Sequence, residues 1–405
     1  LLIFLSYSCT SIKKNFREKE ADINLISNEY IYELDEKISL VNSKNFDDKI
    51  LDYYLDDFDD EIIFNKSIQK KFIINNFKKS YDSLNPIKVY IIDNYLYGID
   101  TKSNFNIYNF ETGKLINSIN LLDDEKNNIS SPSSMALFDN YFIVGFKSGK
   151  IIKIDREGNI LWEYINDRIL STPIKIYNNN LIALYSDTIK AISIDKGNEI
   201  LSELYQGSEV INVKGGSVKQ FANILYFILP NSSVGQIDTF FNEKSYSHFT
   251  TIDYQNSINN AYDDIHVFDN FVSYFDDRLN LYSYDIYLDN FILFQKRISQ
   301  VDSFKFFNNS LIVKNENNIK AYNIKNGNVF WSFDLKKLID KDANIISIHS
   351  INNNVNIFFD NGMVLVINNN EITDLINLKI KNINLLYFQN NRIFFSLMNG
   401  KTTIF

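Results

Sequence analysis

Histidines are the residues best suited to hold a metal ion or to move a proton, and this chain has three of them, His248, His266 and His349. None stands in a His-x-His or His-Glu-x-x-His arrangement, the spacings that bring two metal ligands onto one face of a strand or helix. The chain also has no glycine-rich phosphate loop and no Gly-x-Ser-x-Gly nucleophile motif. The sequence therefore predicts no metal site, no catalytic residues, no cofactor and no small-molecule substrate, and we expect a protein that is not an enzyme.

Cys9 is the single cysteine, so the chain cannot form an internal disulfide bond. The apolar residues 1–5 and a short Ser-Tyr-Ser stretch precede it, and the chain becomes polar immediately afterwards. This order is typical of the end of a bacterial lipoprotein signal peptide, in which the cysteine is acylated. We therefore expect residues 1–9 to be the remainder of a signal peptide and Cys9 to carry a lipid anchor. A buried or incidental cysteine near the end of the chain is the alternative.

Residues 10–61 are polar and acidic, and residues 55–61 read Leu-Asp-Asp-Phe-Asp-Asp-Glu. A calcium loop needs oxygen ligands at alternate positions around a central glycine, and this run has no glycine. We expect residues 10–61 to be an acidic tether that leads from the anchor to a folded domain over residues 62–405.

The overall charge limits the partners of this domain. The formal net charge is -9, which disfavours nucleic acid and anionic lipid headgroups as main partners. No interior apolar run approaches the roughly 20 residues that a membrane-spanning helix needs. We therefore expect no nucleic-acid partner, and membrane attachment only through the lipid.

The folded domain is built from a repeat whose clearest copy is residues 138–164. This copy has three short runs of β-branched and aromatic residues separated by glycine-containing turns, a pattern that favours antiparallel strands joined by hairpins. In the middle run, Ile152 and Ile154 would face one side of the sheet and Ile151 and Lys153 the other. A meander of this size cannot bury both of its faces alone, so it must stack on copies of itself.

Further copies recur at intervals of roughly 40 residues, the length of a four-stranded propeller blade. Seven complete blades are expected, at about residues 84–120, 132–165, 171–205, 217–250, 262–298, 302–335 and 345–380. The last repeat, residues 383–405, has only three strands. We expect residues 70–75 to pair beside residues 402–405 and complete it, because an open sheet edge is a liability. The sequence thus predicts an all-β, eight-bladed β-propeller of four-stranded antiparallel blades.

Two copies of the repeat share a turn glycine followed four residues later by a tryptophan, Gly158 with Trp162 and Gly327 with Trp331. This motif resembles the quinoprotein-type (PQQ-like) repeat. An eight-bladed propeller of this length behind a lipoprotein cysteine resembles the BamB family, the propeller lipoproteins of the outer-membrane β-barrel assembly (BAM) machinery. The resemblance covers about residues 62–405 together with Cys9.

The resemblance implies a scaffold on the outer membrane that faces the periplasm. Its partners would be the barrel insertase (BamA-like) and nascent outer-membrane proteins, and it would be a monomer within the complex. In that family a Leu-x-Leu-Arg-Gly loop contacts the insertase. Here the corresponding residues are Ile211, Val213, Lys214 and Gly215. A second family contact, Asp-x-Asp, would fall at residues 257–259, where both acids are absent. An ordinary loop between blades is the alternative interpretation of residues 211–215.

Two other functions stay open on the sequence. Quinone-dependent dehydrogenases use related repeats, although many carry a vicinal cysteine pair over the cofactor, and Cys9 stands alone outside the ring. A ligand-sensing propeller, or a partner of another envelope complex, is the third possibility, because the fold does not fix the function.

Overall fold

The structure is a computed structural model that describes the strand residues 72–75 and 247–248 and most of the chain from residue 87 onward. The described ranges are 72–75, 87–122, 131–177, 179–204, 216–230, 234–238, 247–248, 265–275, 279–286, 291–336, 338–351, 354–389, 392–398 and 401–404. Regular structure in these ranges consists of β-strands, β1 to β32. No helix in these ranges is long and apolar enough to cross a membrane.

The strands form eight four-stranded antiparallel sheets, which we call blades 1 to 8. Blade 1 contains β2 (Tyr90–Ile92), β3 (Tyr95–Ile99), β4 (Asn104–Asn109) and β5 (Leu115–Asn120), and blade 2 contains β6 (Pro132–Phe138), β7 (Tyr141–Phe146), β8 (Ile151–Ile154) and β9 (Ile160–Tyr164). Blade 3 contains β10 (Lys175–Tyr177), β11 (Asn180–Leu184), β12 (Thr188–Ser193) and β13 (Glu199–Leu204), and blade 4 contains β14 (Ser217–Phe221), β15 (Ile224–Ile228), β16 (Val234–Asp238) and β17 (Ser247–His248).

The second half of the ring repeats this order. Blade 5 contains β18 (Ile265–Phe268), β19 (Phe271–Phe275), β20 (Asn280–Asp285) and β21 (Phe291–Arg297), and blade 6 contains β22 (Ser303–Phe307), β23 (Ser310–Asn315), β24 (Asn318–Asn323) and β25 (Val329–Asp334). Blade 7 contains β26 (Ile345–Ile351), β27 (Asn354–Phe359), β28 (Met363–Asn368) and β29 (Glu371–Asn377), and blade 8 contains β30 (Ile383–Gln389), β31 (Arg392–Leu397), β32 (Lys401–Ile404) and β1 (Phe72–Asn75).

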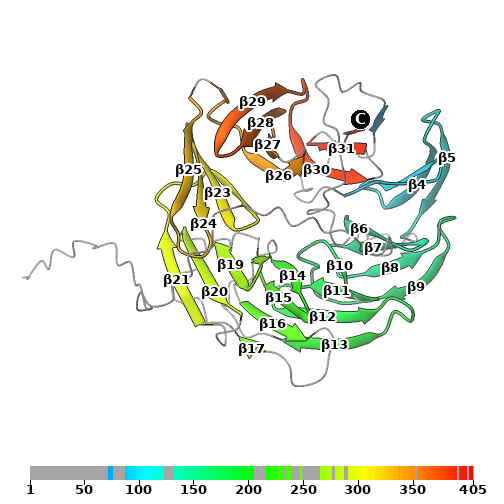
Figure 1. Cartoon of the computed structure of the whole chain (residues 1–405). Coiled ribbons are helices and arrows are strands. Elements are labelled where there is room, and N and C mark those ends of the chain that lie inside the picture. The colour runs from blue at the N-terminus through cyan, green and yellow to red at the C-terminus, as the bar shows by residue number, and fades with distance from the viewer. Residues whose placement is uncertain are drawn as a thin grey trace, which may run out of the picture.

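The blades follow one another around a ring, so blade 8 comes to lie beside blade 1 (Figure 1). This arrangement confirms the eight-bladed propeller of four-stranded antiparallel blades that the sequence predicted. The strands are short, and most are rich in β-branched and aromatic residues, which suit the pleated surface of a sheet.

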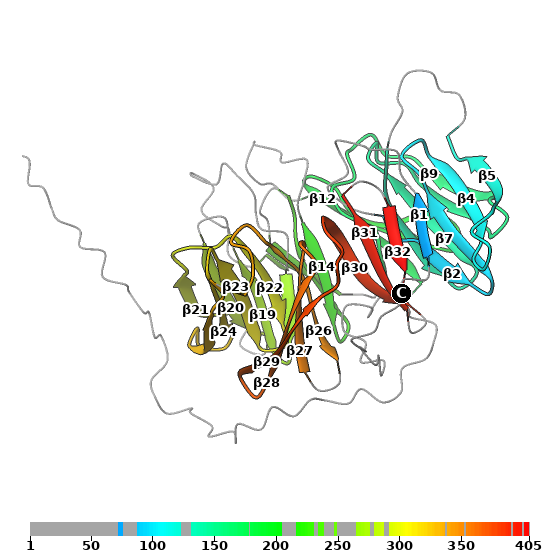
Figure 2. The same ribbon diagram turned by 90° about the horizontal axis from the view of Figure 1, so that it is seen from above.

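The fourth strand of blade 8 comes from the other end of the described chain. β1 pairs antiparallel with β32, with Phe72 opposite Ile404 and Asn75 opposite Lys401. In Figure 2 the two strands lie side by side. The sequence placed residues 70–75 beside residues 402–405. The observed strands are residues 72–75 and 401–404, so the second strand differs from the prediction by one residue.

The core is divided among the joints between blades. The buried apolar residues in the described ranges form eight clusters, and each cluster draws its members from two neighbouring blades. In β8, Ile152 and Ile154 belong to the cluster between blades 1 and 2, whereas Ile151 belongs to the cluster between blades 2 and 3. The predicted alternation is therefore confirmed, and each blade buries one face against each neighbour.

The two faces of the ring differ in which turns they carry. We call the face with the hairpins between first and second strands, and between third and fourth strands, the hairpin face. In five blades the hairpin between the first and second strands turns on an Asp or Asn residue with positive φ. These residues are Asp93, Asp139, Asn179, Asp269 and Asn308. Asp and Asn tolerate this conformation better than other residues with a side chain. The opposite face, which we call the connection face, carries the turns between second and third strands and the connections between blades.

The tryptophan of the repeat motif in blade 2 contacts a turn glycine of the next blade, Gly197. The Nε1–H of Trp162 in blade 2 donates a hydrogen bond to the Ile194 carbonyl of blade 3, 2.8 Å away. A Cβ at Gly197 in blade 3 would lie 2.7 Å from the Trp162 ring, so only glycine leaves room for the indole. The motif tryptophan Trp162 therefore packs against the neighbouring blade rather than within its own blade.

Candidate binding surface

The residues that the sequence singled out for binding lie outside the described ranges. This holds for Cys9 and for Ile211, Val213, Lys214 and Gly215. The described residues that flank the segment 205–215 lie on the connection face at blade 3. Leu204 ends β13 there, and a Cβ at Gly216 would lie 3.2 Å from the Thr172 methyl group.

The histidines with described side chains belong to two different joints. His266 of blade 5 contacts the Asn308 carbonyl oxygen through Nε2 at 2.6 Å and stacks on Phe306 of blade 6. His349 of blade 7 packs edge-on against Phe388 of blade 8, with 4.6 Å between ring centroids. No group of three or more His, Cys, Asp or Glu residues in the described part of the chain could hold a metal ion.

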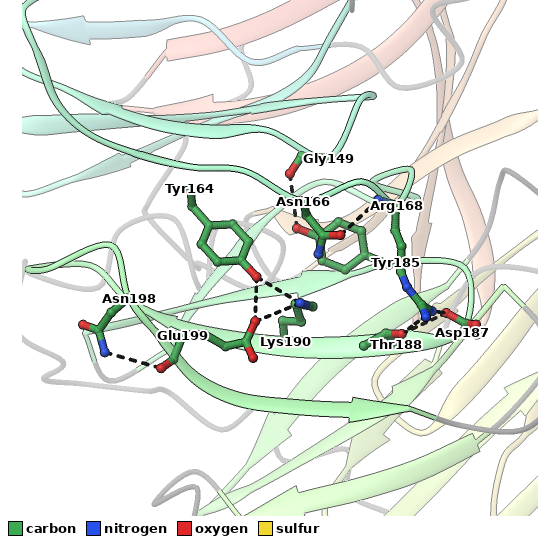
Figure 3. Close-up of polar contacts among 10 residues, drawn as sticks. All are labelled: Gly149, Tyr164, Asn166, Arg168, Tyr185, Asp187, Thr188, Lys190, Asn198 and Glu199. Carbon is green, nitrogen blue, oxygen red and sulfur yellow. Dashed lines mark hydrogen bonds and ion pairs between the residues drawn. The ribbon is translucent and has the colours of Figure 1, made fainter.

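The feature of the connection face best suited to bind a partner is the loop of residues 165–169, between blades 2 and 3. Figure 3 shows the polar contacts of this loop with blade 3, and those between blades 2 and 3 beside it. Ile165 is the most exposed large apolar side chain among the described residues, at 76%. Ile169 is also exposed, at 43%, and Leu204, at the end of the neighbouring outer strand, is 58% exposed. The loop thus presents apolar side chains to solvent between charged and polar residues.

Backbone contacts fix the loop from the side of blade 2. The Leu170 amide donates a hydrogen bond to the Lys147 carbonyl, 3.3 Å away, and the Ser171 amide bonds the Leu184 carbonyl of blade 3 at 3.0 Å. Gly149, with φ at 95°, lies in the turn between β7 and β8 directly beneath the loop. A Cβ there would lie 2.6 Å from the Asn166 carbonyl oxygen and closer still to that of Arg168. The turn and the loop therefore touch backbone to backbone.

Side-chain contacts fix the same loop from the side of blade 3. The buried Asn166 side chain accepts a hydrogen bond from the Arg168 amide at 3.0 Å. The Arg168 guanidinium forms an ion pair with Asp187 and donates to the Thr188 hydroxyl at 2.8 Å. Figure 3 shows the guanidinium reaching over the edge of blade 3 to these two residues. The exposed isoleucines are consequently carried by a backbone with little freedom to rearrange.

A second polar group ties the outer strands of the same two blades. The Tyr164 hydroxyl donates to Glu199 at 2.6 Å, and Lys190 bonds both, Glu199 at 2.8 Å and Tyr164 at 3.0 Å. Burial raises the pKa of Tyr164. Burial alone would lower the pKa of Lys190 and raise that of Glu199, but the hydrogen bonds between them reverse both shifts. At neutral pH the group is therefore a neutral tyrosine held by an ion pair.

Sequence reasoning did not single out the loop 165–169. In the stretch Ile-Asn-Asp-Arg-Ile, Ile165 ends the second predicted blade and residues 166–169 fall between the second and third blades. Two isoleucines in a connection are unusual, because connections are normally polar and exposed, and that composition is the signal that could have found the loop.

Comparison with known proteins gives the fold a name but assigns no family. No protein-family model matches the chain, and no curated protein matches it in sequence. A crystal structure of BamB from Moraxella catarrhalis is similar at 15% identity and a TM-score of 0.61, over 83% of this chain and 98% of that one. The chain has a BamB-like propeller fold.

Two other solved structures superpose on this BamB-like propeller nearly as well. The computationally designed Ika8 protein is similar at 15% identity with a TM-score of 0.58, over 82% of this chain and 99% of that one. Sqt1 from Saccharomyces cerevisiae is similar at 10% identity with a TM-score of 0.58, over 83% and 98%. At these identities the likeness shows the fold alone, so the function must be argued from the surface.

Proposed function

We propose that this chain is a non-enzymatic scaffold lipoprotein of the outer-membrane β-barrel assembly machinery, which binds the barrel insertase and helps to deliver nascent outer-membrane proteins. In this proposal Cys9 anchors the chain in the outer membrane, residues 10–61 form the tether and residues 62–405 form the propeller facing the periplasm. The BamB-like fold and the lipoprotein pattern before Cys9 support the location.

The observation that carries the binding role is the fixed loop 165–169. Docking sites that contribute most to affinity are apolar anchors on a rigid backbone, because little conformational entropy is lost on binding. Ile165 and Ile169 have this character. Both are exposed, and the contacts of Asn166 and Arg168 fix the backbone that carries them. Ile211, Val213, Lys214 and Gly215 stay expected insertase contacts on the sequence alone, because they lie outside the described residues.

Changing Ile165 and Ile169 together to Asp is expected to weaken capture of the insertase by at least about tenfold. Burying one such side chain contributes roughly 1.5–3 kcal/mol, and about 1.4 kcal/mol corresponds to a factor of ten. The measurement is recovery of the insertase from solubilised envelopes with tagged full-length protein, followed by titration with purified insertase.

Ile160→Asp is the matched control, because Ile160 is 45% exposed and lies at the opposite end of β9, on the hairpin face. It should capture the insertase as well as the unmodified protein does. Equal capture by all three proteins would remove the loop from the interface. Failure of the unmodified protein to capture any barrel insertase would end the proposed function.

The proposed anchor has its own test. Cys9→Ser should move the protein from the membrane fraction to the soluble fraction, because a single cysteine provides the acylation site and the acyl chains provide the anchor. The measurement is fractionation of cells that express either protein, with metabolic labelling by a fatty acid. Membrane retention of the Cys9→Ser protein without label would show that another attachment exists.

A further inference from the structure

The outer strand of blade 1, β5, has an open backbone edge. It is the last strand in the sheet order β2-β3-β4-β5, so only one of its sides pairs with another strand of the sheet. Five of its six residues are exposed, with Leu115 at 46% and Ile116 at 53%. Such an edge can accept a further strand through main-chain hydrogen bonds.

Natural proteins usually protect open edges with charged side chains, and the other long outer strands of this ring do so. Among the described fourth strands of five or more residues, each one other than β5 contains at least one charged residue. The strand β5 reads Leu-Ile-Asn-Ser-Ile-Asn and contains no charge and no proline. The edge of blade 1 is therefore the unprotected one in this set.

The direction of the backbone groups of β5 follows from its hydrogen bonds. The Leu121 amide, just beyond the strand, bonds inward to the Ser103 carbonyl at 3.0 Å. The Ser118 amide instead bonds the side-chain oxygen of Asn117 at 2.9 Å. The backbone N–H and C=O groups of successive residues point to opposite sides of a strand, so those of Ser118 and Asn120 point to the open edge. The Asn117 side chain occupies the place that an acceptor from an added strand would take, so an added strand would displace this side chain from the Ser118 amide.

The two faces of β4 and β5 differ in chemistry. On one face an uncharged polar row is hydrogen-bonded across the strands, Ser118 to Asn106 at 2.7 Å and Asn120 to Asn104 at 3.0 Å. On the other face Phe105, Ile107 and Ile119 pack into the apolar joint with blade 2. An added strand would continue both faces, so it should alternate uncharged polar and apolar residues.

We propose that the open edge of β5 binds one extended strand of an unfolded client protein, with alternating apolar and uncharged polar residues, through main-chain bonds to Ser118 and Asn120. This inference rests on the proposed function and deepens it, because strands of outer-membrane barrels alternate in this way. A second copy of β5 fits less well. Leu115 and Ile116 are adjacent apolar residues at an irregularity in the pairing with β4, so β5 itself does not alternate along its length.

The test uses purified full-length protein and a dye-labelled ten-residue peptide of alternating valine and serine, followed by fluorescence anisotropy. The same peptide with N-methyl groups on alternate residues keeps the side chains and loses the edge hydrogen bonds, so it should bind at least about tenfold more weakly. Ile116→Lys should weaken the unmethylated peptide by a similar factor, because it places a charge on the edge. Phe330→Lys is the matched control. It changes the corresponding exposed residue of β25, which Asp334 already protects, and should alter binding by less than twofold.

Ser118→Pro provides a second variant, since it removes the amide that points to the open edge and no amide that pairs with β4. Its peptide affinity should fall as that of Ile116→Lys does. Equal binding of methylated and unmethylated peptide, or unchanged binding by both variants, would overturn the proposal. So would a dimer of the unmodified protein that Ile116→Lys dissociates, because the edge would then belong to a second copy. Insertase capture through residues 165–169 is measured separately, so a failure here leaves the docking role intact.

Discussion

Gly149→Ala is expected to lower the free energy of unfolding by about 2–4 kcal/mol and to abolish capture of the insertase. The residue has φ at 95°, a conformation that costs a residue with a side chain of order 1–3 kcal/mol. The new methyl group would also overlap the Arg168 carbonyl oxygen and lie 2.6 Å from that of Asn166. Neither oxygen can rotate away, because both belong to the backbone. The loop 165–169 must therefore move, and its isoleucines move with it.

A stability loss alone could reduce capture, so a control with the same defect elsewhere is needed. Gly362 occupies the corresponding turn of blade 7, has φ at 83° and would place its Cβ against the Ile380 carbonyl oxygen. Gly362→Ala should cost a similar free energy, measured by urea unfolding, and should capture the insertase normally where the protein is folded. If the two variants capture the insertase equally well, the position of the loop is not what the partner recognises.

The repeat could be predicted from the sequence because it is a local property. Runs of β-branched and aromatic residues, separated by Asp or Asn turns, mark the hairpins wherever the chain turns with positive φ, as at Asp93 and Asp269. The side-chain alternation in β8 could be predicted for the same reason, since side chains along a strand alternate with a period of two residues. Eight such units require a ring once each must bury one face against each of two neighbours.

The contacts between blades could not be predicted in the same way. Lys153 was expected to face away from Ile152, but its bond to the Ile194 carbonyl, 3.1 Å away, depends on how blade 3 docks on blade 2. Burial of its ammonium group lowers the pKa of Lys153. The alternation of side chains along β8 gave no reason to expect that this lysine is buried. The loop 165–169 is fixed in the same manner, by Asp187 and Thr188 of the next blade. Contacts between docked blades follow no periodic pattern in the sequence, so the sequence alone does not reveal them.

The joint that closes the ring is the extreme case, because its partners are 298 residues apart. The Tyr387 hydroxyl of blade 8 accepts a hydrogen bond from the Val89 amide at 2.8 Å and donates one to the Val89 carbonyl at 3.0 Å. Two residues further along β30, the Gln389 amide group bonds Ile91 in the same way, at 3.1 and 3.3 Å. Four side-chain hydrogen bonds thus hold the backbone next to and within β2, where Val89 and Ile91 are buried.

Replacing Tyr387 by Phe and Gln389 by Leu together is therefore expected to lower the free energy of unfolding by about 3–5 kcal/mol. A buried polar group that loses its partner costs roughly 1–3 kcal/mol, and the double variant removes the partners of four such bonds without creating a large cavity. Tyr177→Phe is the matched control, because the Tyr177 hydroxyl donates a corresponding bond to the Val218 carbonyl at 3.1 Å, between blades 3 and 4. That variant should cost only about 1 kcal/mol.

The double variant should also change how the protein unfolds. With the joint between blades 8 and 1 weakened, the ring can open there first, so amides of β2, β3 and β30 should exchange hydrogen faster than those of β11 and β12. The urea transition should broaden, because opening at one joint ends the all-or-none behaviour of a closed ring. A loss no larger than that of Tyr177→Phe, with exchange unchanged at blade 1, would mean that closure depends on the apolar contacts of Val89, Leu96 and Phe394 rather than on these hydrogen bonds.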